Sequence, residues 1–125
     1  MMNFSETPEF KKDVKRLAKK WRSVPNDVDA SKAYILPLYG KLDENVSVEL
    51  YRQAFFSGKR AAVLLAGEGY EVIKMRLDCE SLGTNSKIRI IFVAVKTQDS
   101  IEFVELYAKN EKDREDKKRF AQYIK

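Results

Sequence analysis

The chain has 125 residues, of which 44% are hydrophobic and 34% are charged. This balance argues against a disordered polar chain, and the length suits one domain with one hydrophobic core. No apolar run approaches the length of a bilayer-spanning helix, and the opening MMNFSETPEF lacks the features of a secretory signal. Because a single cysteine, Cys79, cannot form an internal disulfide, we expect a reducing, cytoplasmic environment.

Histidine is absent, which removes the commonest general base and the commonest metal ligand. We therefore expect no zinc site and no cofactor. The net charge is +5, and the basic side chains concentrate toward both ends: residues 1–22 carry seven Lys or Arg against three acids, and residues 105–125 carry seven against five. This distribution favours a polyanion or an acidic protein as partner, although a basic protein without such a partner is the alternative.

The segment TPEFKKDVKRLAKKWRS predicts a helix, with Thr7 as its N-cap and Pro8 at its first position. One narrow apolar stripe follows the helical period, formed by Phe10, Val14, Leu17 and Trp21. The preceding MNFS fits a short edge strand. A second helix is expected from about Asp27, with Pro37 ending or kinking it.

A third helix is expected over SVELYRQAFF, with Gly58 as its stop and Val48, Tyr51 and Phe55 on its packing face. The period then changes to two. RAAVLLAG fits a buried strand or the tail of a helix, and three strands follow at 70–78, 87–95 and 101–107.

The closing DREDKKRFAQYIK predicts a short helix capped by Asp113, with Phe120, Ile124 and Tyr123 toward the core. The order of these elements predicts an α+β fold in which N-terminal helices pack on an antiparallel meander and a short C-terminal helix ends the domain.

The hydrophobic faces of the strands set their register. Pairing Leu77 with Ile88 aligns the apolar residues of two strands on one face, and it places Arg76 opposite Arg89 on the other. Lys74 then lies opposite Ile91.

Across the next turn, pairing Val95 with Ile101 places Arg89 beside Tyr107 and Ile91 beside Glu105. The second face of the sheet is therefore expected to have a basic end that contains Lys74, Arg76, Arg89 and Tyr107, with Lys109 and Lys112 just beyond. Like charges directly opposite each other destabilise a sheet by roughly 0.2–1 kcal/mol. Either an ion pair with Glu105 or an anionic ligand could offset that cost, and arginine suits phosphate oxygens.

The order, spacing and charge of FKKDVKRLAKKWRS, YEVIKMRL, KIRIIFVAV and IEFVELYAKNEKD resemble the RelE/ParE superfamily of bacterial toxins, especially its RelE- and HigB-like members. The match covers residues 7–30 and 70–113. It implies one RelE-like toxin domain over residues 1–125, with an insertion at about 36–66 that contains its own helix.

The resemblance implies the toxin of a type II toxin–antitoxin system, whose partner is a small acidic antitoxin protein. Such toxins are mRNA interferases: they cleave mRNA on the ribosome without a metal, by attack of a 2′-hydroxyl on the adjacent phosphate, and so inhibit translation. A ParE-like relative would instead act on DNA gyrase without cutting RNA. A plain basic RNA-binding domain is a third hypothesis.

Carried over by position, the resemblance assigns catalysis to Lys74, Arg76, Arg89 and Lys109, and RNA binding to Tyr107, Lys87 and Lys112. The two arginines would hold the phosphate oxygens, and Lys74 would orient or deprotonate the 2′-hydroxyl. Lys109 or Tyr107 would donate the proton to the leaving oxygen. The chain departs from the family at Lys109, where RelE-like proteins often carry arginine, and Tyr123 is too distant to match their terminal tyrosine or histidine.

Overall fold

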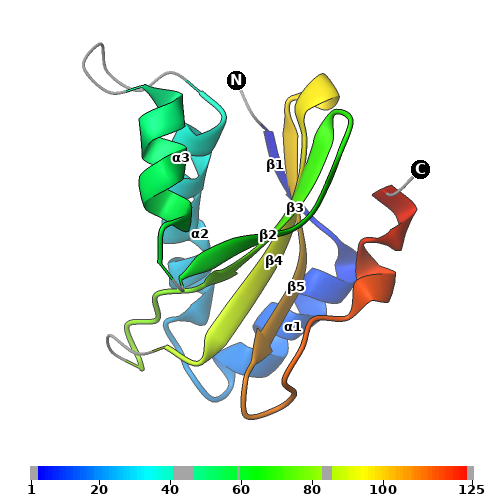
Figure 1. Cartoon of the computed structure of the whole chain (residues 1–125). Helices are drawn as coiled ribbons and strands as arrows, with labels where there is room; N and C mark the ends of the chain where they lie inside the picture. Colours follow the sequence, from blue (N-terminus) through cyan, green and yellow to red (C-terminus); the bar gives the residue numbers. More distant parts are fainter. Residues whose placement is uncertain (1–2, 41–46, 59, 83–85, 124–125) are drawn as a thin grey trace.

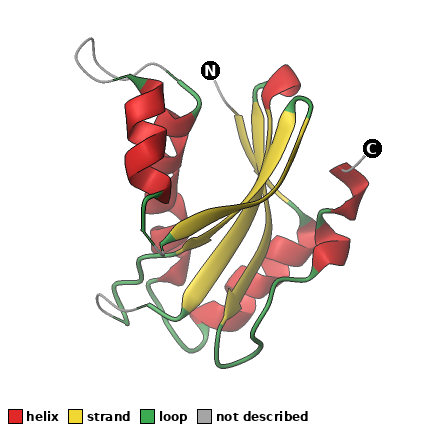
Figure 2. Cartoon of the chain, in the orientation of Figure 1, coloured by secondary structure: helices red, strands yellow, loops and turns green. Residues whose placement is uncertain are grey.

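The computed structural model describes residues 3–40, 47–58, 60–82 and 86–123, and it shows a mixed α+β fold (Figures 1 and 2). The helices are α1 (Pro8–Ala18), α2 (Val24–Ile35) and α3 (Val48–Phe56). The strands are β1 (Asn3–Glu6), β2 (Ala61–Gly67), β3 (Tyr70–Arg76), β4 (Ile88–Val95) and β5 (Ser100–Ala108). Short 3-10 turns occupy Leu36–Leu38, Lys96–Gln98, Lys117–Arg119 and Ala121–Tyr123. Within the described ranges, no helix is long and apolar enough to cross a membrane.

The five strands form one sheet in the order β1-β5-β4-β3-β2. Strands β3, β4 and β5 are antiparallel neighbours as predicted. Strand β2, where a buried strand or a helix tail was expected, pairs antiparallel with β3 at the edge of the sheet, whereas β1 runs parallel to β5. The three helices pack on one face of this sheet, which we call the helix face. The chain after β5, residues 109–123, contributes Phe120 and Tyr123 to a smaller apolar cluster on the opposite, second face.

The predicted local signals account for where the helices begin. The Thr7 hydroxyl accepts a hydrogen bond from the Phe10 N–H, and Pro8 occupies the first helical position, so α1 begins as predicted. The Ser47 hydroxyl caps α3 in the same way. Helix α2 begins three residues earlier than predicted, because Pro25 fits the first turn of a helix rather than the turn before it.

The helix-face core confirms the predicted pairing of apolar faces. Met75 of β3 pairs with Ile90 of β4, and both are fully buried beneath the helices. In α1, Phe10 and Leu17 are buried, but the stripe also contains a buried carboxylate, Asp13, which hydrophobic periodicity did not reveal.

A β-bulge in β5 corrects the predicted register of the last two strands. Near the basic end the pairing is as expected, with Arg89 opposite Tyr107 and Ile91 opposite Glu105. Beyond Ile91 the register shifts by one residue, so Val95 pairs with Ser100 and not with Ile101. The extra residue is Val104, which packs in the second-face cluster.

The predicted C-terminal helix is wrong over the described residues, where residues 113–123 form only two short 3-10 turns. Asp116, not Asp113, accepts a backbone hydrogen bond as a cap, from the Lys118 N–H. Phe120 is buried as predicted and Tyr123 is half-buried, while Ile124 lies outside the described residues. Ion pairs and hydrogen bonds to α1 and β5 fix this segment, and these replace the helical ladder.

The stretch predicted as an insertion, residues 36–66, contains α3 and most of the edge strand β2. A buried ion pair anchors α3 to the sheet: both Arg52 guanidinium nitrogens donate to the Glu71 carboxylate at 2.9 Å, and Tyr39 donates to it as well. Burial by itself raises the pKa of Glu71. The hydrogen bonds from Arg52 and Tyr39 outweigh burial and leave that pKa below its usual value.

A carboxylate with a lowered pKa stabilises the fold above its unfolded-state pKa, and this contribution is lost as the pH falls through the folded-state pKa. We expect Glu71→Gln to reduce the free energy of unfolding at neutral pH by about 1–3 kcal/mol, because the Gln amide keeps the shape but not the charge. The difference from the wild type should shrink below about pH 4, as the wild-type carboxylate becomes protonated. Urea unfolding over this pH range measures both effects. The exposed Glu49→Gln on α3 is the matched control, and equal losses at neutral and acidic pH would contradict the prediction.

Candidate functional site

A row of three side chains crosses the second face at one end of the sheet. Arg76 on β3 pairs with Arg89 on β4, and Arg89 pairs with Tyr107 on β5. Because directly opposed strand residues share a face, the two guanidinium groups and the phenol project to the same side. We call these three residues the arginine row. The row confirms the predicted cross-strand placement.

No carboxylate of the described residues neutralises the two arginines of the row. Neither Arg76 nor Arg89 takes part in any ion pair between described residues. Among the described residues, Arg89 donates to the backbone oxygens of Ser86 at 3.0 Å and Ile88 at 3.3 Å. Burial, followed by the neighbouring charge of Arg76, lowers the pKa of Arg89 below its ordinary value. Two half-buried cations thus face each other without a counter-charge among the described residues.

Two polar atoms of the row are also buried without a hydrogen-bond partner in the described part of the chain: the Arg76 Nε and the Tyr107 hydroxyl. Buried donors of this kind are normally satisfied, because leaving one unpaired costs about 1–3 kcal/mol. Both atoms can donate to an oxygen. Together with the unpaired guanidinium groups, they make an oxyanion the fitting ligand for this row.

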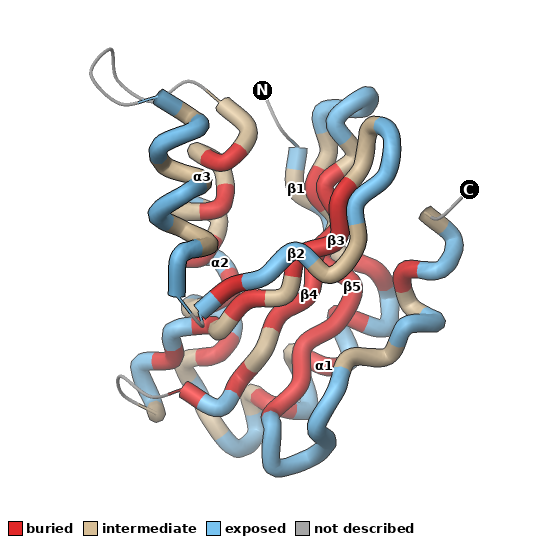
Figure 3. The backbone as a smooth tube through the Cα atoms, in the orientation of Figure 1, coloured by how far each residue is buried: buried red, intermediate tan, exposed pale blue. Residues whose placement is uncertain are grey.

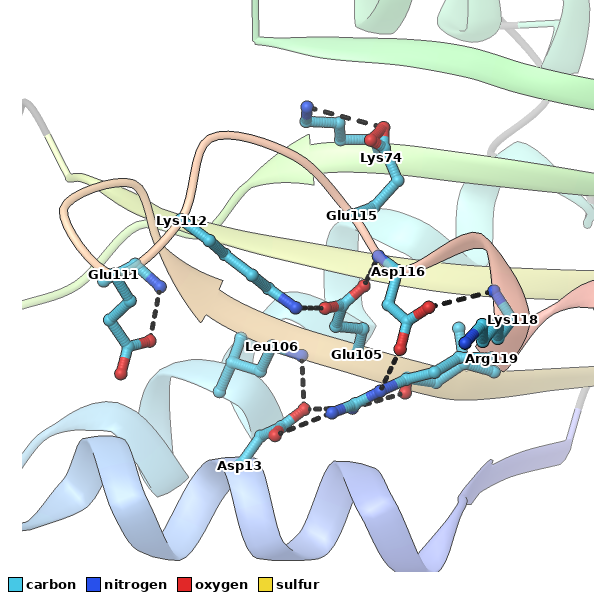
Figure 4. A network of polar contacts seen from close by, with 12 residues as sticks. Asp13, Lys74, Glu105, Leu106, Glu111, Lys112, Glu115, Asp116, Lys118 and Arg119 are labelled. Carbon is cyan, nitrogen blue, oxygen red and sulfur yellow. Dashed lines mark hydrogen bonds and ion pairs between the residues drawn. The ribbon is translucent and has the colours of Figure 1, made fainter.

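In the next row on the same face, both charged side chains form ion pairs within the protein. This row consists of Lys74, Ile91 and Glu105, paired across the three strands. Residues 109–116 cross over it and supply both counter-charges, as Figure 4 shows. Lys112 bonds to the fully buried Glu105, and Glu115 lies 3.6 Å from the Lys74 ammonium.

Lys74 and Lys112, both predicted as site residues, therefore lie next to the arginine row, but each forms an ion pair. Their ammonium groups lie 5.9 Å and 5.3 Å from the centre of the Tyr107 ring, within cation–π range. Lys74 also lines a cavity of about 580 Å³ between β2 and the C-terminal segment, together with Leu65, Glu115 and Phe120. Tyr107, predicted to bind RNA or to donate a proton to the leaving oxygen, is fully buried.

Lys87 and Lys109 extend the basic surface beyond the strand ends. The Lys109 N–H donates to the Lys87 carbonyl at 2.9 Å, so the β4–β5 ladder continues by one pair. Both residues are exposed, and strand alternation places them on the side of Arg89 and Tyr107. The arginine row and these two lysines form one basic end. Lys109 lies there as predicted, whereas Lys74 and Lys112, also predicted there, are held in ion pairs.

The sequence did not predict the ion-pair network around Asp13 that holds the C-terminal segment in place. The buried carboxylate of Asp13 accepts hydrogen bonds from Arg119, from Arg16 and from the backbone N–H of Leu106. Arg16 also bonds to Glu111 at both carboxylate oxygens. The one available signal was an acidic residue inside the apolar stripe of an otherwise basic helix.

No group of three or more potential metal-ligating side chains occurs within the described ranges. No family model, curated protein or solved structure matches the chain. The likeness to the RelE/ParE superfamily therefore rests on the order, spacing and charge of the sequence motifs.

The arginine row generates a direct binding prediction. Inorganic phosphate should raise the midpoint of thermal unfolding relative to chloride at equal ionic strength, because the ion binds the folded protein alone. Arg89→Ala should weaken phosphate binding by about tenfold or more, since one charge-assisted contact is lost. Differential scanning fluorimetry across a phosphate titration measures this. Lys12→Ala, on the exposed side of α1, is the matched control, and an equal phosphate response in the two variants would refute the site.

Proposed function

We propose that the protein is an endoribonuclease toxin that cleaves mRNA without a metal, and that its second face binds the RNA backbone. The observation that carries this proposal is the arginine row. It places two guanidinium groups, without a carboxylate among the described residues, beside two unsatisfied buried donors. A phosphodiester supplies the negative charge and the oxygen acceptors that this arrangement lacks.

The chemistry proceeds in one displacement. The 2′-oxygen attacks the adjacent phosphorus, the bond to the 5′-oxygen breaks, and a 2′,3′-cyclic phosphate and a 5′-hydroxyl form. Arg76 and Arg89 hold the non-bridging oxygens and stabilise the charge that develops on them. Such preorganised donors in a partly buried site contribute more than they would in water.

Proton transfers are assigned to groups beside the row. Lys74 orients the 2′-hydroxyl, and the carboxylate of its partner Glu115 accepts the proton. Lys109 donates a proton to the departing 5′-oxygen, because it is exposed at the end of the row whereas the Tyr107 hydroxyl is buried. The buried Tyr107 hydroxyl is assigned no proton transfer.

A second candidate function is supported by a different observation. Lys74 and Lys112 are both held in ion pairs by the C-terminal segment. A surface that binds an anion while Lys74 and Lys112 beside it are held in ion pairs suits a non-catalytic binder, such as a ParE-like toxin. In either case, the exposed basic end is the expected contact for a small acidic antitoxin.

Expression in a bacterial host with primer extension on its transcripts separates the two functions. For the endoribonuclease, we expect growth arrest and new 5′ ends in mRNA, with cleavage reduced about 100-fold or more by Arg89→Ala and by Arg76→Ala. Lys12→Ala should retain full cleavage, and circular dichroism should show that all variants are folded. Growth arrest with intact transcripts would support the binder, and cleavage that survives both arginine substitutions would overturn the catalytic assignment.

A further inference from the structure

We propose that the outer surface of α1 binds the phosphate backbone of double-stranded RNA, at a place separate from the arginine row. Lys11, Lys15 and Lys19 are spaced four residues apart, so they lie along one line of the helix. Lys19 is the C-cap of α1 and keeps helical backbone angles. All three lysines are exposed, and Figure 3 shows exposed residues along α1. We call them the lysine ridge, which spans about 12 Å of helix.

The lysine ridge lies on the side of α1 that faces away from the sheet. Helix α1 packs on β5 through its buried stripe: the Phe10 and Phe103 rings stack with their centroids 5.3 Å apart, and Asp13 accepts a hydrogen bond from the Leu106 N–H. The exposed lysines lie on the other side of the helix. A ligand on the lysine ridge and a ligand on the arginine row therefore contact opposite sides of the molecule.

The charges of the lysine ridge have no partner within the described ranges, where none of the three lysines forms an ion pair. The neighbouring line of the helix differs. It contains Arg16, which pairs with Asp13 at 2.9 Å and with Glu111 at 3.0 Å. It also contains Lys20, whose ammonium lies 4.9 Å from the centre of the Trp21 ring. The neighbouring line is thus used inside the protein, whereas the lysine ridge is open to a ligand.

The stability of α1 does not account for the lysine ridge. Like charges four residues apart repel and destabilise a helix, and the ridge contains two such pairs. Lys11 also lies near the N-terminus of α1, where the helix dipole disfavours a cation. The dipole favours Lys15 and Lys19 at the other end, but it does not explain Lys11 or the repeated spacing. A polyanion along the ridge would relieve the repulsion.

The composition of this surface favours nucleic acid over an acidic protein as the ligand. Lysine is depleted in protein–protein interfaces, which are anchored by aromatic and apolar side chains. Among the described residues, the exposed large hydrophobic side chains are Leu50 and Val63, and neither lies on α1. Phosphate contacts, by contrast, come largely from lysine and arginine and need no apolar anchor.

The same composition favours a duplex over a single strand. Proteins that bind single strands stack the bases on aromatic side chains, whereas a duplex is contacted mainly through its shape and its backbone. Trp21, the aromatic residue next to the ridge, is partly buried against the helix-face core, and Lys20 lies over its ring. The surface is argued from α1 alone, and only the choice of RNA over DNA rests on the proposed function.

Fluorescence anisotropy of the intact protein with a labelled RNA hairpin of about 16 base pairs tests the lysine ridge in a salt titration. We expect the logarithm of the binding constant to fall linearly with the logarithm of the salt concentration. The triple variant Lys11→Gln/Lys15→Gln/Lys19→Gln should reduce the magnitude of that slope by about 3, because three phosphate contacts are lost. It should also weaken binding about 100-fold at roughly 0.1 M salt.

The matched control is Lys96→Gln/Lys117→Gln/Lys118→Gln, which removes the same charge from exposed lysines outside α1. It should bind the hairpin within about threefold of the wild type, and circular dichroism should show that both triple variants are folded. Equal losses in the two triple variants would overturn the lysine ridge, because they would reflect net charge alone.

Three further probes test the choice of ligand. Oligouridylate of the same length should lose much less affinity than the hairpin when the ridge is substituted, and equal losses would overturn the choice of a duplex. Ridge-dependent binding of polyglutamate without binding of the hairpin would identify an acidic protein instead. A DNA duplex that binds more than about tenfold tighter than the RNA would overturn the choice of RNA. A protein that cleaves mRNA but binds no hairpin would refute the lysine ridge and leave the proposed function standing.

Discussion

The structure depends on one buried carboxylate, that of Asp13. It sits in the apolar stripe of α1, where it receives a backbone N–H from β5 and guanidinium groups from α1 and from the C-terminal segment. A buried charge is tolerated only when it is fully paired and hydrogen-bonded, and loss of one partner of such a set typically costs about 3–5 kcal/mol. Through this group the helix that covers one face of the sheet also fixes the segment that covers the other.

The C-terminal segment determines which charged side chains of the second face form ion pairs and which do not. Residues 109–116 bring a lysine to Glu105 and a glutamate to Lys74, but among the described residues none of their carboxylates forms an ion pair with Arg76 or Arg89. On the second face, the charges of the row that contains Lys74 and Glu105 are therefore neutralised, whereas those of the arginine row are not. A ligand that neutralises the arginine row relieves the mutual repulsion of Arg76 and Arg89, which is the electrostatic reason to place an anion there.

Much of this arrangement follows from the sequence, because strand periodicity and helix capping are local signals. The apolar alternation of β3 and β4 fixed the pairing of Arg76 with Arg89, and the Thr7–Pro8 signal located the start of α1. The parallel pairing of β1 with β5 and the bulge at Val104 depend on contacts between residues far apart in the chain, which periodicity does not report.

The C-terminal segment was mispredicted for the same reason. Its charge pattern is compatible with a helix, but long-range bonds of Arg119 and Asp116 hold it in short turns. The partners of Lys74 and Lys112 come from this segment. Sequence reasoning could therefore place these lysines on the correct face without showing that they are already paired.

The position of β1 in the sheet has a consequence for synthesis of the protein. Residues 3–6 are translated before every other element of this fold, yet their partners in β5 are residues 100–103. Tyr107 and the segment that closes the second face come later still. While α1, α2 and the β2–β3 hairpin are built from neighbouring residues, the arginine row can assemble only after β5 has emerged from the ribosome. A chain that stops before β5 would therefore lack the arginine row.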